Sequence, residues 1–182
     1  MMAKEIQNPG SALGEAIGSQ MELALNHFFT ELADEFNCYF ISKGPINKVN
    51  NKHKKLLMSD AFDNKYNIDS VIVNEAMQPL ILIESKYIRY TKHNRDKGSW
   101  ICTAHTALRQ KYTSIRSSIA ILAGNWSSTS IAMIKSHGTN VFLIPFELIC
   151  VLLQSHNINF NWEEKDRILA TKSWRKYCAL SN

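Results

Sequence analysis

The sequence predicts an α/β fold in which a mixed central sheet is flanked by helices. Two adjacent apolar segments, Tyr66–Val73 and Pro79–Lys86, have the pattern of neighbouring strands in a hairpin with a polar turn between them. Later in the chain, short apolar runs that suit buried strands alternate with segments of helical periodicity. A hairpin followed by strands that alternate with helices implies one sheet with helices on its faces.

The first predicted helix runs from Ser11, whose side chain can cap the N-terminus, to about Phe36. Its apolar residues recur in steps of three and four, so one face is expected to be buried. These residues are Leu13, Ile17, Met21, Ala24, Phe28, Leu32 and Phe36. Glu15 and Glu22 are seven positions apart and therefore lie together on a different face.

Three short segments separate this helix from the hairpin. Cys38–Ile41 is a candidate strand, and Leu56–Met58 is a brief strand or turn. The stretch between them, Lys43–Lys55, is polar and basic and is expected to be a loop.

After the hairpin, residues 87–100 are polar and charged with little periodicity, which predicts a loop. The elements expected after this loop are a helix over Ile101–Ser117, a strand over Ser118–Ala123, a short helix from Ser127 or Ser128 to about His137, a strand over Val141–Ile144, and helices over Phe146–Gln154 and from Asn161 to about Leu180. In the last helix Trp162, Ile168, Leu169, Trp174 and Tyr177 are expected to pack inward.

Length and composition limit the class of protein but do not identify a binding partner. A length of 182 residues with 45% hydrophobic content suits one domain with a sizeable core. The net charge of +5 permits a polyanionic partner. The four cysteines are widely spaced and include no CxxC pair, so we expect free thiols and a cytoplasmic location. No segment approaches the length of a membrane span, and no membrane partner is expected.

The hairpin carries a cluster of charges where the candidate chemistry lies. Asp69 is early in the first strand, and Glu84 and Lys86 end the second. An antiparallel hairpin brings Asp69 beside the far end of its partner, and residues two apart point to the same side of a sheet. Such charges are costly to bury unless they pair or hold a cation. The sequence therefore predicts either a structural ion pair or a metal site.

Phosphodiester hydrolysis is a reaction that this cluster could serve. One or two hard divalent cations stabilise the charge on the phosphate, and Mg²⁺ takes oxygen ligands such as carboxylates. Asp69, Glu84 and the main-chain carbonyl of Ser85 could supply them. Lys86 could orient the attacking water or offset the developing negative charge. Its role as a strict base is less favoured, because neighbouring carboxylates stabilise the ammonium form.

Asp69 followed by Glu84-Ser85-Lys86 resembles the signature of the PD-(D/E)XK nuclease superfamily, with Ile68 where the family name has proline. The resemblance implies a core of a helix, three strands, a helix and a strand, and metal-dependent DNA cleavage. It implies that Asp69 and Glu84 bind the metal and that Lys86 is the catalytic lysine. Many members add a glutamate from the first helix, for which Glu22 is the first choice here and Glu15 the second.

On this basis residues 1–182 are expected to form one nuclease domain, with a catalytic core over 11–145 and a helical extension over 146–182. The leading hypothesis is a Mg²⁺-dependent endonuclease for double-stranded DNA, a type II restriction enzyme that acts as a homodimer and accepts Mn²⁺ in place of Mg²⁺. A Holliday junction resolvase and a non-catalytic DNA-binding module are the alternatives. Basic residues after the site are expected to contact DNA: Arg89, Lys92, His93, Arg95, Lys97, Arg109, Lys111 and Arg116.

Three further titratable residues near the site are interpreted as structural. Asp60 and Asp63 lie in a turn-like sequence and are expected to be solvated rather than to bind metal. His105 lies in a predicted helix and is expected to face solvent or line the cleft.

Overall fold

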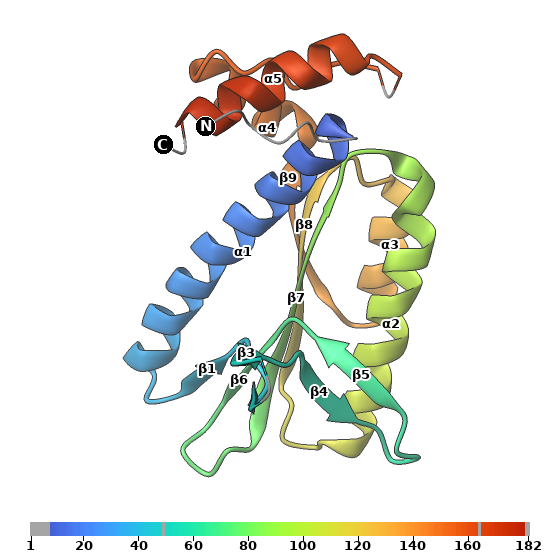
Figure 1. Ribbon diagram of the computed structural model, residues 1–182. Coiled ribbons are helices and arrows are strands. Elements are labelled where there is room, and N and C mark those ends of the chain that lie inside the picture. Colours follow the sequence, from blue (N-terminus) through green and yellow to red (C-terminus); the bar gives the residue numbers. More distant parts are fainter. Residues whose placement is uncertain (1–7, 49, 164, 181–182) are drawn as a thin grey trace.

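The computed structural model describes residues 8–48, 50–163 and 165–180, and it confirms the α/β class. A mixed sheet of five strands, in the order β1-β6-β7-β8-β9, forms the middle layer. Strands β1, β6 and β7 are antiparallel, and β7, β8 and β9 are parallel. Helix α1 covers one face of this sheet, and α2 and α3 cover the other (Figure 1).

The helices are α1 (Pro9–Glu35), the short 3₁₀ helix η1 (Thr91–His93), α2 (Asn94–Lys111), α3 (Ser128–Ser136), α4 (Phe146–Ser155) and α5 (Arg167–Leu180). The strands are β1 (Tyr39–Ile41), β2 (Ile46–Asn47), β3 (Lys52–His53), β4 (Leu56–Ser59), β5 (Lys65–Ile68), β6 (Ser70–Val73), β7 (Pro79–Ile88), β8 (Ser117–Gly124) and β9 (Asn140–Pro145). The basic stretch predicted to be a loop contains the small hairpin β2–β3.

Helix α1 begins earlier than predicted and buries different residues in its second half. Asn8, rather than Ser11, caps it by accepting a hydrogen bond from the Ser11 amide at 3.2 Å. The predicted Phe28 and Phe36 are exposed, whereas Phe29 is buried. The first half of α1 packs beside α5, and the second half packs on the sheet. The buried face therefore rotates along the helix, and a single stripe does not describe it.

The predicted strand Tyr66–Val73 is broken at Asp69. Residues before the break form β5, which pairs with β4 in a separate two-stranded sheet, and residues after it form β6 of the central sheet. Strand β6 pairs with β7 only as far as Ile83. In the described part of the chain, β7 from Glu84 onwards therefore pairs with β8 alone and has one open edge. The charged cluster lies on this open edge.

Helix α2 begins at Asn94, so the prediction of a loop up to residue 100 is wrong. The buried amide of Asn94 donates hydrogen bonds to the carbonyls of Thr91 and Asn125, at 3.0 and 2.9 Å. Gly98 lets α2 approach α3 closely, since a Cβ atom there would lie 2.8 Å from Met133 Cε. These tertiary contacts stabilise a first turn that has little apolar periodicity of its own.

The ends of β7 and β8 are held in close register. Gly124 has φ +93°, and a Cβ atom at this position would lie 2.0 Å from the carbonyl oxygen of Ile88. Only glycine tolerates both conditions. The next residue, Asn125, donates from its side chain to the Arg89 carbonyl at 2.6 Å. The stretch of β7 that follows Lys86 is therefore fixed in place.

The C-terminal region differs most from the prediction. Helix α5 begins at Arg167 rather than at Asn161, and the preceding segment packs as irregular chain with Phe160 and Trp162 buried. Ile168, predicted to pack inward, is 83% exposed. Strand β9 is an edge strand rather than a buried one. None of the helices described has the length and apolarity needed to cross a membrane, and the four cysteines are free thiols.

Candidate active site

The hairpin brings Asp69 and Glu84 together, as predicted. The register that pairs Ser70 with Ile83 places the next residues, Asp69 and Glu84, opposite each other. The Asp69 amide donates to Glu84 Oε1 at 3.3 Å, and the Ser85 amide donates to Asp69 Oδ2 at 3.0 Å. Each carboxylate is thus oriented by the main chain of the other strand.

Lys86 completes the cluster. Its Nζ lies 2.6 Å from Asp69 Oδ2 and 2.6 Å from Glu84 Oε2. Glu84 is fully buried, and the Lys86 side chain is 21% exposed. The ammonium therefore lies between two carboxylates, one of which is out of contact with water. This pair of oxygens favours a cation strongly.

The protonation of the cluster follows from burial. Burial raises the pKa of Glu84 to about 7, with the Lys86 ammonium opposing the shift and Asp69 adding to it. Burial alone would lower the pKa of Lys86, but the two carboxylates outweigh it and raise that pKa. Lys86 therefore remains an ammonium at neutral pH, while Glu84 gains stability as an anion from any further cation beside it.

The oxygens at this edge match the ligands of a hard divalent cation. The N–H of Ser85 points to the open edge of β7, and the carbonyl of a residue in a strand points to the same side as its N–H. Among the residues described, no group of three or more His, Cys, Asp and Glu side chains gathers as a ready-made ion site. Two carboxylates and one carbonyl are nevertheless enough for Mg²⁺, which keeps several waters.

Glu22 is the helical glutamate that lies nearest the cluster. Glu22, Ser85 and Lys86 line both of two adjoining hollows: an upper hollow of about 920 Å³ toward α5 and a lower hollow of about 460 Å³ beside Asp69. Burial and the nearby Asp69 raise the pKa of Glu22, against the effect of Lys86. Glu15 lines only the upper hollow. The geometry therefore favours Glu22 over Glu15.

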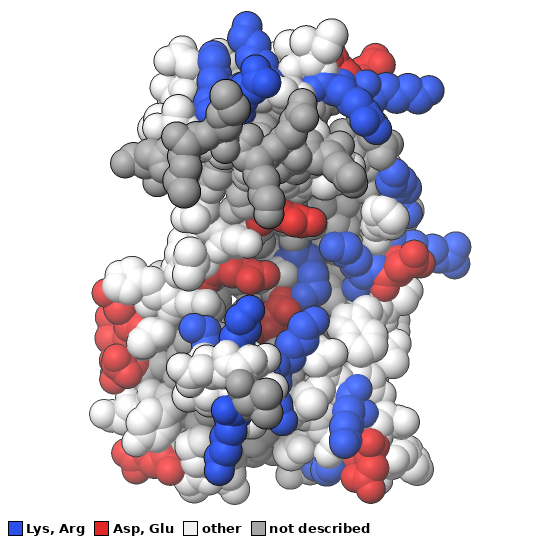
Figure 2. All heavy atoms as spheres, in the orientation of Figure 1, with Lys and Arg blue, Asp and Glu red and all other residues white. Residues whose placement is uncertain are grey.

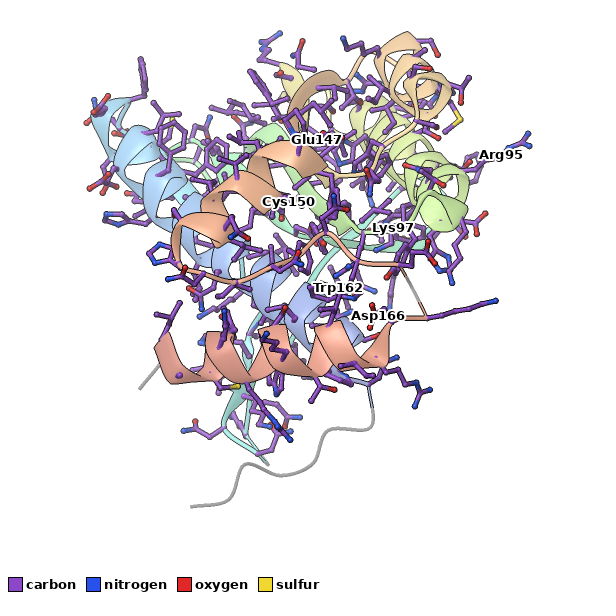
Figure 3. The ribbon with its side chains drawn as sticks, turned by 90° about the horizontal axis from the view of Figure 1, so that it is seen from above. Arg95, Lys97, Glu147, Cys150, Trp162 and Asp166 are labelled. Carbon is purple, nitrogen blue, oxygen red and sulfur yellow. The ribbon has the colours of Figure 1, made fainter. Side chains whose placement is uncertain are left out.

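Part of the predicted basic surface surrounds these hollows. Lys92, His93 and Lys97 line the upper hollow together with Lys86. Burial and the Lys86 ammonium lower the pKa of Lys97, which places its side chain near the cluster. Figure 2 shows Lys and Arg side chains around a central hollow that contains acidic ones. Arg95 instead projects outward from α2, away from Lys97 (Figure 3).

Arg89 has a structural position that the sequence did not reveal. It is 8% exposed, and its guanidinium lies 3.9 Å from the ring centre of Trp162 and 4.2 Å from that of Phe160. It donates to the carbonyls of the same two residues, at 3.1 and 2.9 Å. Arg89 thus anchors the C-terminal segment through Nη2 while it also lines the upper hollow, and its contact with DNA stays a prediction.

The three basic residues predicted on and after the following helix lie away from the cluster. Arg109 donates to the carbonyls of His137 and Gly138 and so stabilises the end of α3. Lys111 donates to Ser59 Oγ at 2.8 Å and to the Asp60 carbonyl at 3.0 Å. Arg116 is exposed beside the first residues of β7, at the end opposite to Lys86. These three residues therefore do not line the catalytic cluster, and their contact with DNA stays a prediction.

His105 and Asp60 are buried, contrary to expectation. His105 is fully buried, and burial lowers its pKa to about 4, so the ring is neutral at pH 7. Asp60 organises the turn before β5 by accepting hydrogen bonds from Phe62, Asn64 and Tyr66. Asp63 is exposed in the same turn, as predicted.

The structure adds residues to the site that the sequence did not single out. Lys55 and Trp100 line the lower hollow with Asp69, and Arg167 lines the upper hollow with Lys86. Lys55 ends a run of basic residues that was interpreted only as a loop, and that run was the available signal. No protein-family model, curated protein or solved structure matches the chain.

Proposed function

We propose that this protein is a Mg²⁺-dependent endonuclease of the PD-(D/E)XK superfamily that cleaves double-stranded DNA, as type II restriction enzymes do. One observation carries the proposal: Lys86 Nζ lies within 2.6 Å of both Asp69 and Glu84 on an open strand edge. The edge faces two hollows with basic side chains on their rims. A scissile phosphate in this position would meet carboxylates for a metal and cations for its charge.

The fold agrees with this proposal. Counting only the central sheet, α1 is followed by the antiparallel strands β1, β6 and β7, then by α2 and β8, while β2 to β5 form two small hairpins between β1 and β6. This is the order of helix, three strands, helix and strand that the superfamily resemblance implies. Asp69 lies at the break between β5 and β6, and Glu84 is the first residue of β7 beyond its pairing with β6.

The roles of the side chains follow from their charge and burial. Asp69, Glu84 and the Ser85 carbonyl would hold Mg²⁺, with Glu22 as a further ligand, and the ion would polarise the phosphate and lower the pKa of a bound water. Lys86 is held as an ammonium, so it orients the attacking water and offsets negative charge. Lys97 and Lys92, on the rim of the upper hollow, would contact neighbouring phosphates.

Cleavage of a plasmid tests the proposal directly. The full chain is incubated with supercoiled plasmid and with a synthetic four-way junction, with Mg²⁺, with Mn²⁺ or with EDTA. We expect discrete metal-dependent fragments of the plasmid. Cleavage confined to the junction would favour a resolvase, and DNA binding without cleavage under all metals would favour a non-catalytic module.

Substitution of the lysine tests the site. Lys86→Ala is expected to lower the cleavage rate by about 10²- to 10⁴-fold, because one positioned group near the reacting phosphate contributes about this much. Lys135→Ala, an exposed lysine on α3, is the matched control and should cleave normally. A Lys86→Ala protein that cleaves at the normal rate would exclude this catalytic centre.

We also propose that two copies act together on the two strands of the duplex, since each chain has one such cluster. The outer strand β9 and the helix α4 that follows it expose apolar side chains, namely Phe142, Leu143, Leu148, Val151 and Leu152. An exposed apolar edge of this kind is typical of a surface that pairs with another chain. A two-fold axis there would give an isologous dimer.

A further inference from the structure

Helix α5 carries a strongly basic exposed face outside the site described above. Arg167, Lys172, Arg175 and Lys176 lie on it, and residues 167–180 include no acidic side chain. All four line one shallow surface together with Ile168 and Thr171. Figure 2 shows Lys and Arg gathered over the top of the molecule, where Figure 1 places α5.

This arrangement is electrostatically unfavourable for the protein alone. Lys172 is three and four positions before Arg175 and Lys176, and like charges at these spacings destabilise a helix. Arg167 is the first residue of α5, where the helix dipole disfavours a cation. Across residues 8–48, 50–163 and 165–180, none of the four forms an ion pair. An external polyanion would relieve this repulsion.

The basic face is continuous with the rim of the catalytic cluster. Arg167, which starts α5, lines the upper hollow together with Lys86, Lys92 and Lys97. The preceding segment that carries Trp162 is anchored on Arg89, only three positions after Lys86 in the chain. The packing of this segment thus fixes the start of α5 beside the cluster. A backbone that leaves the cluster through the upper hollow reaches Arg167 and then the remaining cations.

We propose that the exposed face of α5 is a second phosphate-contact surface, which holds the DNA backbone where it leaves the catalytic cluster. The inference rests on the proposed DNA substrate, but it does not depend on cleavage. An anionic membrane surface is the competing partner for a basic helix with an exposed Ile168. The shared rim with Lys86 favours nucleic acid.

The salt dependence of DNA binding tests this surface without any cleavage. The affinity of the full chain for a 30-base-pair duplex is measured in EDTA at several salt concentrations. We compare wild type, Lys172→Gln/Arg175→Gln, and the control Lys135→Gln/Lys65→Gln. The control removes the same charge from exposed positions on α3 and β5. Circular dichroism and the melting temperature confirm that each variant folds.

Each phosphate contact contributes about 0.9 to the slope of log affinity against log salt. The α5 variant should therefore lose about 1.8 of this slope and bind roughly tenfold more weakly at moderate salt. The control should keep the wild-type slope. Equal slopes for all three proteins, or equal losses in both variants, would overturn the inference. The same three proteins are also tested for binding to phosphatidylserine vesicles. An α5 variant that loses vesicle binding and keeps DNA binding would likewise overturn the inference.

The two proposals can fail separately. A protein that shows the α5-specific slope change but never cuts DNA retains the inference and loses the proposed nuclease function. A protein that cuts plasmid while its α5 variant binds and cuts normally retains the function and loses the inference.

Discussion

Glu84 is the carboxylate of the cluster that has no exposed surface, whereas the Asp69 side chain is partly exposed. Its charge is opposed by burial and favoured by Lys86, and Asp69 lies beside it. A group in this position destabilises the fold when ionised and binds a cation well. His105, buried on α2, also favours its neutral form, but a histidine is neutral at high pH, so its effect on stability has the opposite pH dependence.

The shifted pKa values of Glu84 and His105 predict how the free energy of unfolding depends on pH. The pKa of Glu84 is raised from 4.5 to about 7, so its stabilisation is complete below pH 4.5 and is lost as the pH rises to 7. The pKa of His105 is lowered from 6.5 to about 4, so its stabilisation is complete above pH 6.5 and is lost as the pH falls to 4. The two effects oppose each other between these limits, and the wild-type profile should be nearly flat there.

Glu84→Gln should therefore raise the free energy of unfolding at pH 8 by about 1–3 kcal/mol, with no difference from wild type at pH 4.5. Urea denaturation across pH 4–8 measures it. In His105→Gln the free energy of unfolding should fall as the pH rises, because only the Glu84 effect remains. In Glu84→Gln it should increase as the pH rises, because only the His105 effect remains. Glu75→Gln, in the exposed turn after β6, is the control and should follow wild type. A Glu84→Gln difference that is the same at every pH would contradict the buried charge.

Glu22 and Glu15 can be separated by metal binding. Mg²⁺ should raise the melting temperature of wild type, because it binds the folded cluster and not the unfolded chain. Glu22→Gln should weaken the apparent Mg²⁺ affinity by about tenfold, whereas Glu15→Gln should leave it unchanged. Thermal denaturation in a Mg²⁺ titration measures this. Equal effects of both substitutions, or none, would remove the α1 glutamates from the metal site.

At the scale of elements, the local parts of the site were predictable and the long-range parts were not. Asp69, Glu84 and Lys86 belong to one hairpin, so strand pattern alone brought them together. The break at Asp69 required knowledge that β4 pairs with β5. The burial of Arg89 required its aromatic partners Phe160 and Trp162, which lie more than 70 positions later. The onset of α2 depended on contacts with Asn125 and Met133 that no local pattern reveals.

The contacts of Arg89 with Phe160 and Trp162 are expected to hold the segment before α5 against β7. Arg89→Ala removes two hydrogen bonds and leaves a cavity between aromatic rings, so it should cost about 2–4 kcal/mol of unfolding free energy. Arg95→Ala, at an exposed position on α2, should change it by less than about 0.5 kcal/mol. Urea denaturation measures both. If Arg89→Ala instead keeps full stability and reduces the salt slope of DNA binding, Arg89 is a phosphate contact after all.

At the scale of the whole molecule, the three layers place the charged cluster at one position and the apolar edge at another. The cluster lies on the open edge of β7, and β9 forms the outer edge of the sheet beyond β8. Binding of DNA and pairing of two copies would therefore use different surfaces.

The assembly state tests this separation. We expect wild type to be a dimer in light scattering at micromolar concentration, and Val151→Glu to be a monomer, because the substitution places a charge in the apolar surface of α4. The variant should accumulate nicked plasmid before linear product. Phe62→Glu, at an 86% exposed position in the turn before β5, should remain dimeric. A monomeric wild type would exclude this dimer.

The hairpin origin of the cluster also has a consequence for the order of folding. Asp69 and Glu84 meet across a tight local connection, whereas Glu84 reaches its β8 neighbour Ala120 only after all of α2 has formed. Local pairs close early, since little loop entropy opposes them. On a ribosome, the two carboxylates and Lys86 can therefore associate before β8 has been synthesised. These side chains would then associate while still hydrated. Glu84 would lose its contact with water only later, when α2 and β8 pack against the hairpin.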